Sequence, residues 1–152
     1  MEKTNVMRLL DASSLPYTPH WYDSSLTDGE SVAKALGQDP DSVFKTLVTT
    51  DGRGHFVFVV PVSRTLDLKK AARAAGVKSI AMIPQKELLP LTGYVHGGCS
   101  PIGMKKPFPT FVSDEAVLFD RIVFSAGKRG FQVEMNPVDL IRYVHGSFED
   151  IT

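Results

Sequence analysis

The chain has very little cysteine, no excess charge of either sign and no long apolar run. A single cysteine among 152 residues excludes a disulfide framework and a cysteine-rich zinc or iron–sulfur site, and is typical of a reducing compartment. No run of about 18 apolar residues is present to cross a membrane. The first residues, Met-Glu-Lys-Thr-Asn, lack the layout of a signal peptide. We therefore expect a cytoplasmic protein with no membrane partner.

The balance of charge also restricts the partners. Lysine and arginine number 17, aspartate and glutamate number 17, and the formal net charge is zero. A protein that grips a long stretch of nucleic acid carries a surplus of cations, because neutralising phosphates dominates that affinity. Any contact with nucleic acid should therefore be local, brief or shared with another protein.

Length and periodicity predict one α+β domain that spans residues 1–152. The composition, with 43% hydrophobic and 22% charged residues, is that of an ordinary globular protein. Helical spacing is found over residues 4–11, 27–36, 66–75, 84–89 and 137–144, and strand-like runs over 17–22, 77–82 and 93–96. Hairpins are expected where residues 43–50 meet 55–62 and where 121–125 meet 131–135. These elements predict a mixed, largely antiparallel sheet flanked by helices.

Lys45 is an unusual residue in the strand that opens the first hairpin. Alternation places it on one face with Val43 and Leu47, while Phe44 and Val48 lie on the other, so both faces are otherwise apolar as in a central strand. A lysine there is costly unless its ammonium reaches solvent or a partner. It is either a snorkelling or edge lysine, or a cation directed at a substrate carbonyl, hydroxyl or phosphate.

Two glycine-rich segments could bind a ligand through the backbone. Residues 97–103, Gly-Gly-Cys-Ser-Pro-Ile-Gly, allow close approach to a ligand but lack the ending of a P-loop. The turn Gly127-Lys128-Arg129-Gly130 is either a plain hairpin turn or a backbone nest flanked by phosphate-reading cations. Each can also be a rigid turn with a purely structural role, and neither motif alone identifies a ligand.

The remaining reactive side chains form no recognisable site. The four histidines show no metal-ligand spacing, and no catalytic triad or carboxylate pair can be assembled. No sequence signature marks a base for Cys99, so a small buried thiol is the better interpretation. We expect neither a metal ion nor another cofactor.

Four motifs in order resemble the YbaK/EbsC family, the freestanding relatives of the editing domain of prolyl-tRNA synthetase. They are residues 43–48 (Val-Phe-Lys-Thr-Leu-Val), 66–70 (Leu-Asp-Leu-Lys-Lys), 93–103 with the glycine loop, and 125–130 (Ser-Ala-Gly-Lys-Arg-Gly). The resemblance covers nearly the whole chain. It implies the editing-domain fold and a deacylase that clears mischarged Cys-tRNA(Pro) in trans, in the service of translation fidelity.

The resemblance also implies a set of site residues. The essential lysine of the family falls on Lys45. The substrate-binding positions fall on Tyr22, Thr46, Gly97, Gly98, Ser100, Pro101, Gly103, Ser125, Gly127, Lys128, Arg129 and Gln132. Gln132 departs from the pattern, since some Cys-tRNA(Pro) deacylases carry an aspartate there. In the family mechanism the thiol of the substrate attacks its own ester, so no protein nucleophile is needed.

Two alternative functions compete with this interpretation. The same fold could act on Ala-tRNA(Pro) or another aminoacyl-tRNA, or it could be a non-catalytic module that binds or senses aminoacyl-tRNA. All three share the aminoacylated acceptor end of tRNA as partner. The neutral surface is also compatible with prolyl-tRNA synthetase as a second partner that supplies selectivity for the tRNA.

Overall fold

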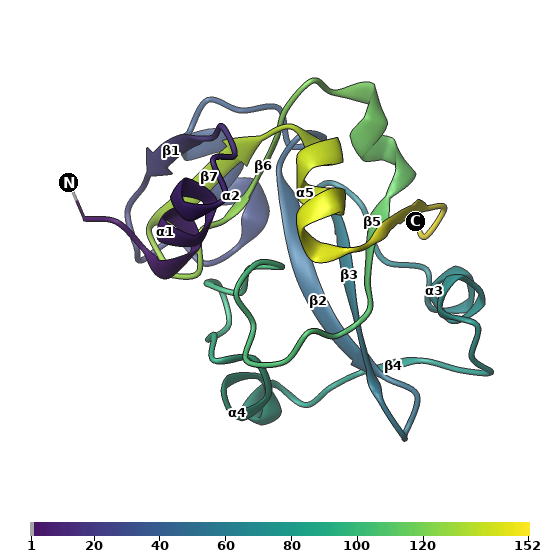
Figure 1. Ribbon diagram of the computed structural model, residues 1–152. Coiled ribbons are helices and arrows are strands. Elements are labelled where there is room, and N and C mark those ends of the chain that lie inside the picture. The colour runs from purple at the N-terminus through teal and green to yellow at the C-terminus, as the bar shows by residue number, and fades with distance from the viewer. Residues whose placement is uncertain (1) are drawn as a thin grey trace.

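The computed structural model describes residues 2–152, which form two β-sheets surrounded by short helices (Figure 1). The helices are α1 (Asn5–Ala12), α2 (Gly29–Ala35), α3 (Leu68–Ala75), α4 (Leu88–Thr92) and α5 (Pro137–Val144), with 3-10 turns η1 at Gln85–Glu87 and η2 at Asp114–Leu118. The strands are β1 (Thr18–Trp21), β2 (Phe44–Thr50), β3 (His55–Pro61), β4 (Ala81–Met82), β5 (Thr110–Ser113), β6 (Ile122–Ser125), β7 (Phe131–Met135) and β8 (Ser147–Glu149).

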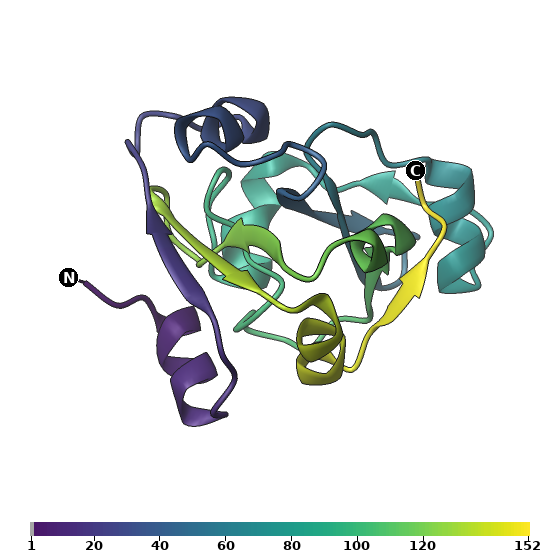
Figure 2. The same cartoon turned by 90° about the horizontal axis from the view of Figure 1, so that it is seen from above.

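One sheet is small and antiparallel, and the other is larger and mixed. The small sheet has the order β1-β7-β6, and the large one has the order β4-β2-β3-β5-β8, in which β3, β5 and β8 run parallel. A bridge between Val43 and Val123 joins the two sheets just before β2 begins. The small sheet with α1 and the large sheet with α3 lie on opposite sides of the molecule, as do the two chain ends (Figures 1 and 2).

The core fills both faces of the β2–β3 hairpin. Val57 and Val59 pack in the main cluster, which includes buried residues of α1, α5 and the small sheet. Phe58 and Val60 point the other way and pack against the alanines of α3. This alternation is what a strand buried on both faces requires.

Helix ends and hairpin turns follow the local sequence. Thr4, Asp67 and Asn136 cap α1, α3 and α5, each accepting a backbone N–H with its side chain. In the first hairpin the Asp51 carboxylate accepts the N–H groups of Arg53 and Gly54 at 2.9 and 2.8 Å. The structure agrees to within one residue with the predicted bounds of three elements, namely the helix 137–144 and the strands 121–125 and 131–135.

Several predicted bounds are wrong. Residues 93–96 do not form a strand: Gly93 is left-handed at φ 86°, and the Gly98 N–H returns to the Val95 carbonyl at 2.9 Å, so the chain turns. Only Ala81–Met82 of the expected strand 77–82 pairs with β2. The expected helix 66–75 begins at Leu68, and the helix expected at 84–89 continues to Thr92. Strands β5 and β8 were not predicted.

The strand expected at 17–22 is shorter in the structure but is present. β1 includes Pro19 opposite Val133 and lies at the edge of the small sheet, where a missing N–H is tolerated.

Within residues 2–152 no helix is both long and apolar enough to cross a membrane.

Candidate functional site

A cavity of about 280 Å³ opens beside β2, close to the point where the two sheets meet. Residues of β2, the start of α2, the loop at residues 96–99 and the adjoining ends of β6 and β7 form its walls. β4 pairs only with Thr49 and Thr50, so within residues 2–152 no strand pairs with Lys45–Leu47 on the side away from β3. The expected central strand is therefore open along one edge, and the cavity lies there.

Lys45 lies on this open edge and lines the cavity. Its side chain is half-buried, and its strand neighbour across the hairpin is Val60. Within residues 2–152 the Lys45 ammonium forms no hydrogen bond and no ion pair. A half-buried cation without a protein partner is available to an anionic or carbonyl group that enters the cavity.

Two buried oxygen atoms in the cavity wall also lack a partner. They are Oγ1 of Thr46 and Oε1 of Gln132, and no side-chain or backbone donor of residues 2–152 reaches either. Gln132 is only 6% exposed and lies opposite Ser125 in the β6–β7 ladder. Buried polar atoms nearly always have partners, so such a pair beside a cavity indicates hydrogen bonds that a ligand completes.

The glycine loop and the β6–β7 turn pack directly on each other. The Arg129 Nε donates to the His96 carbonyl at 2.8 Å. A Cβ on Gly98 would lie 3.1 Å from the Arg129 backbone nitrogen, so a larger residue there would have to displace that backbone by a few tenths of an ångström. Tyr94 secures the other end of the loop, since its hydroxyl donates to the Ile102 carbonyl and its ring lies against Gly127.

The structure divides the predicted binding residues into two groups. Tyr22, Thr46, Gly97, Ser125 and Gln132 line the cavity together with Lys45. The others, Gly98, Ser100, Pro101, Gly103, Gly127, Lys128 and Arg129, are not among its lining residues. The substrate roles of both groups stay predictions.

Several members of the second group have contacts within the protein. Ser100 is fully buried and accepts the Ile102 N–H at 3.3 Å. Lys128 forms an exposed ion pair with Glu2 at 2.8 Å and lies over the ring of Phe131. Arg129 holds the loop through its Nε rather than standing free.

Sequence reasoning missed three polar residues of the wall, namely Thr27, Asp28 and His96. Thr27 and Asp28 belong to a segment predicted only as a helix start, and His96 precedes the glycine loop. The Asp28 carboxylate accepts the Ser31 hydroxyl at 3.0 Å. The one available signal was their position, because residues just before a helix and next to a glycine loop recur at binding sites.

Cys99 lines the cavity but is unsuited to attack a substrate. Burial raises the pKa of the Cys99 thiol to about 12, so almost none of it is thiolate near neutral pH. Tyr94 is close by, and burial also raises the pKa of its hydroxyl to about 12. Within residues 2–152 no group of three or more His, Cys, Asp or Glu side chains is placed to hold a metal ion. The wall can bind and polarise a ligand, whereas its one thiol is not activated.

Comparisons with known proteins identify the relatives of this chain. The family model of the aminoacyl-tRNA editing domain matches residues 24–143. A protein of Enterococcus faecalis named EbsC, a candidate Cys-tRNA(Pro)/Cys-tRNA(Cys) deacylase, is 44% identical over 99% of this chain and 94% of its own length. A proline–tRNA ligase of Shouchella clausii is 28% identical over 67% of this chain, which corresponds to 18% of that enzyme.

The fold is shared with a solved structure as well. The crystal structure of a candidate trans-editing enzyme for prolyl-tRNA synthetase superposes with a TM-score of 0.85 at 22% identity, covering 100% of this chain and 99% of that one. The α+β fold class predicted from the sequence is confirmed by this likeness and by the mixed and antiparallel sheets described above.

Proposed function

The chain belongs to the aminoacyl-tRNA editing domain family, and from this membership we propose that it removes cysteine from mischarged Cys-tRNA(Pro). The family resemblance carried by the four sequence motifs is confirmed. The family and the deacylase name of the relative support the general activity, deacylation of aminoacyl-tRNA. The choice of cysteine and of tRNA(Pro) is the part that we propose.

The cavity beside Lys45 is the observation on which this proposal rests. Its volume of about 280 Å³ suits a small aminoacyl group and part of a ribose. The unpartnered Thr46 and Gln132 oxygens can accept hydrogen bonds from the α-ammonium or hydroxyl groups of such an ester. The Lys45 ammonium is the cation in the wall that can face developing negative charge.

The proposed reaction needs no protein nucleophile. The cysteinyl sulfur, as thiolate, forms a bond to the carbonyl carbon of its own ester, and the bond from that carbon to the ribose oxygen breaks. The proton lost by the thiol ends on the ribose oxygen, and tRNA leaves. Water then opens the cyclic thioester and releases cysteine. The protein contributes orientation of sulfur and carbonyl, which is worth several powers of ten, and stabilisation of the oxyanion by Lys45.

This scheme agrees with the protonated state of Cys99. A covalent mechanism through the protein would require a thiolate, and burial acts against it by raising the pKa of Cys99 to about 12. Selection against correctly charged Pro-tRNA(Pro) then follows from chemistry, because proline has no thiol.

We further propose that the whole chain, residues 1–152, acts as one editing domain in the cytoplasm beside prolyl-tRNA synthetase. The match to EbsC extends over 99% of the chain, and part of a proline–tRNA ligase resembles it. The equal numbers of acidic and basic residues support a role for the synthetase in binding the body of the tRNA. A protein with zero net charge has little attraction for that body by itself.

The test compares tRNA(Pro) charged with cysteine, serine, alanine and proline under single-turnover conditions. We expect cleavage of the cysteine ester and, for the serine ester, a rate lower by at least about 100-fold, since a thiol supplies a usable fraction of nucleophilic anion and an alcohol does not. Binding alone could not separate the two, because near-isosteric groups differ by only about 1–3 kcal/mol.

Each other pattern of rates would contradict a defined part of the proposal. Comparable cleavage of the serine ester would mean that water or a protein group attacks. Faster cleavage of the alanine ester would make Ala-tRNA(Pro) the substrate. Binding without cleavage of any ester would leave a recognition module. The affinity for uncharged tRNA(Pro), measured in parallel, separates differences in binding from differences in the rate of cleavage.

A further inference from the structure

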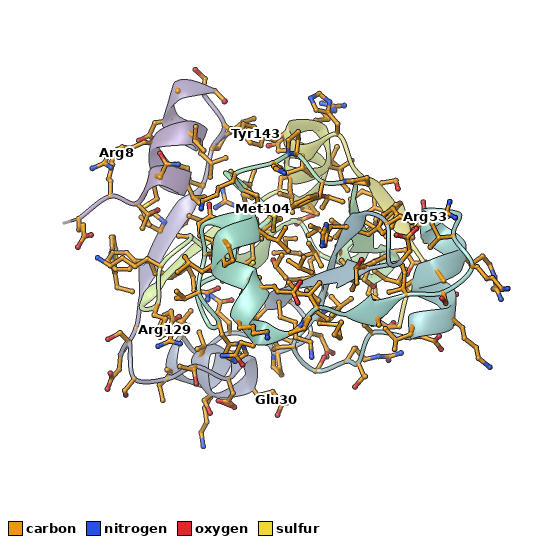
Figure 3. All side chains as sticks on the ribbon, turned by 90° about the horizontal axis from the view of Figure 1, so that it is seen from below. Arg8, Glu30, Arg53, Met104, Arg129 and Tyr143 are labelled. Carbon is orange, nitrogen blue, oxygen red and sulfur yellow. The ribbon has the colours of Figure 1, made fainter. Side chains whose placement is uncertain are left out.

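The two sheets separate just after the bridge that joins them, and the cavity beside β2 lies at this separation. At the bridge the Val123 N–H donates to the Ser42 carbonyl at 2.9 Å, as in a parallel pair of strands. Within residues 2–152 no strand pairing continues this bridge. Figure 3 labels Arg129 at the left and Glu30 at the bottom, in two segments that form or support the cavity wall, and Arg53 of the β2–β3 turn far to the right.

One strand edge at this separation belongs to β2, and the groups on it are those of Thr46. In an antiparallel ladder both main-chain groups of a residue point to one neighbouring strand, and those of the next residue point to the other. The Val43 carbonyl accepts the Val62 N–H at 2.7 Å on the side of β3, and the Val48 carbonyl accepts the Ile83 N–H at 3.3 Å on the opposite side. The N–H and C=O of Thr46 therefore point away from β3, where no strand of residues 2–152 pairs with them.

The other strand edge belongs to β6, and the groups on it are those of Ser125. The Ala126 N–H donates to the Phe131 carbonyl at 3.0 Å, toward β7. The same alternation turns the N–H and C=O of Ser125 away from β7, to the side of the bridge with β2. Thr46 and Ser125 both line the cavity, so the two edges border the same space.

The chemistry of these edges suits an aminoacyl ester. Thr46 is half-buried and Ser125 is only 8% exposed, and main-chain groups buried to this degree nearly always have partners. An aminoacyl ester has the N–Cα–C=O sequence of a peptide residue, so it offers a donor and an acceptor at the spacing of a strand. Peptides bind to open sheet edges in this way, through main-chain hydrogen bonds.

We propose that the aminoacyl group binds between these two edges as a strand residue would, with the Thr46 N–H donating to its ester carbonyl oxygen. This inference rests on the proposed function for the identity of the ligand. The α-ammonium donates to carbonyl groups on the edges. The negative charge that develops on the ester oxygen then meets the Thr46 N–H as well as the Lys45 ammonium. Because every α-amino acid has these atoms, the pairing holds any aminoacyl group and leaves the choice of cysteine to its thiol.

The test removes the Thr46 N–H and leaves every side chain in place. The α-hydroxy acid analogue of threonine, incorporated at position 46 by suppression of a stop codon, puts an ester oxygen where the N–H was. We expect single-turnover cleavage of Cys-tRNA(Pro) to be at least about 100-fold slower than in the wild-type protein, the usual cost of one oxyanion donor. A rate equal to that of the wild type would overturn the proposal.

A binding measurement separates this inference from the proposed function. The probes are 3′-aminoacylamino-3′-deoxyadenosines carrying cysteine or alanine, in which an amide replaces the ester and is not cleaved. Both should bind the altered protein about threefold to tenfold more weakly than the wild type, the contribution of one hydrogen bond, while adenosine should bind equally. Failure of the wild type to cleave Cys-tRNA(Pro) would refute the proposed function alone, and unchanged affinity for both probes would refute the pairing alone.

Trp21 provides the matched control. The Tyr22 N–H donates to the Gly130 carbonyl at 3.0 Å, so the N–H of Trp21 points to the outer edge of β1, away from β7. Trp21 is not part of the cavity wall. Its replacement by indolelactic acid also removes one strand-edge N–H, and should leave the rate and both affinities unchanged. An equal loss at both positions would show a general effect of the ester bond on the sheets and overturn the proposal.

A change in the ligand gives a further test that does not depend on how the altered protein folds. In an ether analogue of the alanine probe, a CH₂ group replaces the carbonyl, so the acceptor for the Thr46 N–H is missing. We expect the wild-type protein to bind it at least about threefold more weakly than the amide. Equal affinities for the two would overturn the proposal.

Discussion

Replacing Lys45 by methionine should remove most of the activity while leaving the protein folded. The ammonium lines the cavity, is half-buried, and has no hydrogen-bond or ion-pair partner within residues 2–152. No protein group is therefore left unsatisfied when the charge is removed. Methionine keeps the length and apolar character of the stem beside Leu47.

The two expected effects differ in size. Removal of one electrostatic stabiliser from an oxyanion site costs about 100- to 1,000-fold in rate, or about 3–4 kcal/mol. The free energy of unfolding should change by no more than about 1 kcal/mol. We expect the change to be stabilising, because an unpaired cation no longer has to be partly desolvated on folding.

The assay is single-turnover release of cysteine from Cys-tRNA(Pro), with urea unfolding of the same preparation. Lys78→Met is the matched control, since Lys78 is exposed and forms no part of the cavity wall. It should retain wild-type turnover. A folded Lys45→Met protein with near wild-type turnover would refute the reasoning, because Lys45 would then be a surface lysine whose position beside the cavity is incidental.

Three further changes probe the rest of the site. Cys99→Ser should keep turnover within a few-fold, whereas a nucleophilic cysteine would lose about 10⁴-fold or more; a covalent adduct trapped on Cys99 would decide against us. Gly98→Ala should slow deacylation by at least about tenfold, because its Cβ would lie 3.1 Å from the backbone of Arg129 and displace the loop, while Gly54→Ala, with nothing within 4 Å, should not. Stability should fall as the pH rises from about 9 toward 12, because burial raises the pKa values of Cys99 and Tyr94 from 9.0 and 10.0 to about 12 and only the unfolded chain ionises in that window. A Cys99→Ser/Tyr94→Phe protein should lose less stability in alkaline urea titrations, and an equal loss would contradict this assignment.

The sequence by itself determined the elements that depend on neighbours along the chain. The caps Thr4, Asp67 and Asn136 and the turn at Asp51 act within a few residues, so the helices they begin and the hairpin that turn closes were predictable. The alternation of apolar residues around Lys45 also marked a charge out of place. The four motifs were sufficient to indicate the family.

Tertiary structure decided what depends on partners distant in the sequence. β5 and β8 are short strands that exist because β5 pairs in parallel with β3 and β8 pairs in parallel with β5, and no local pattern of 3 or 4 residues predicts such pairing. The same holds for Gly98, which meets the Arg129 backbone instead of the cavity.

The resemblance named six residues of the cavity wall, but how they are arranged was decided by the tertiary structure. Thr46 and Gln132 come from different sheets, and their unpartnered oxygens share one wall only because the Val43–Val123 bridge brings the sheets together beside an open strand edge. Local propensities fix caps and turns through contacts over a few residues. A cavity, in contrast, is the space left after distant segments have packed, and its lining is set by that packing alone.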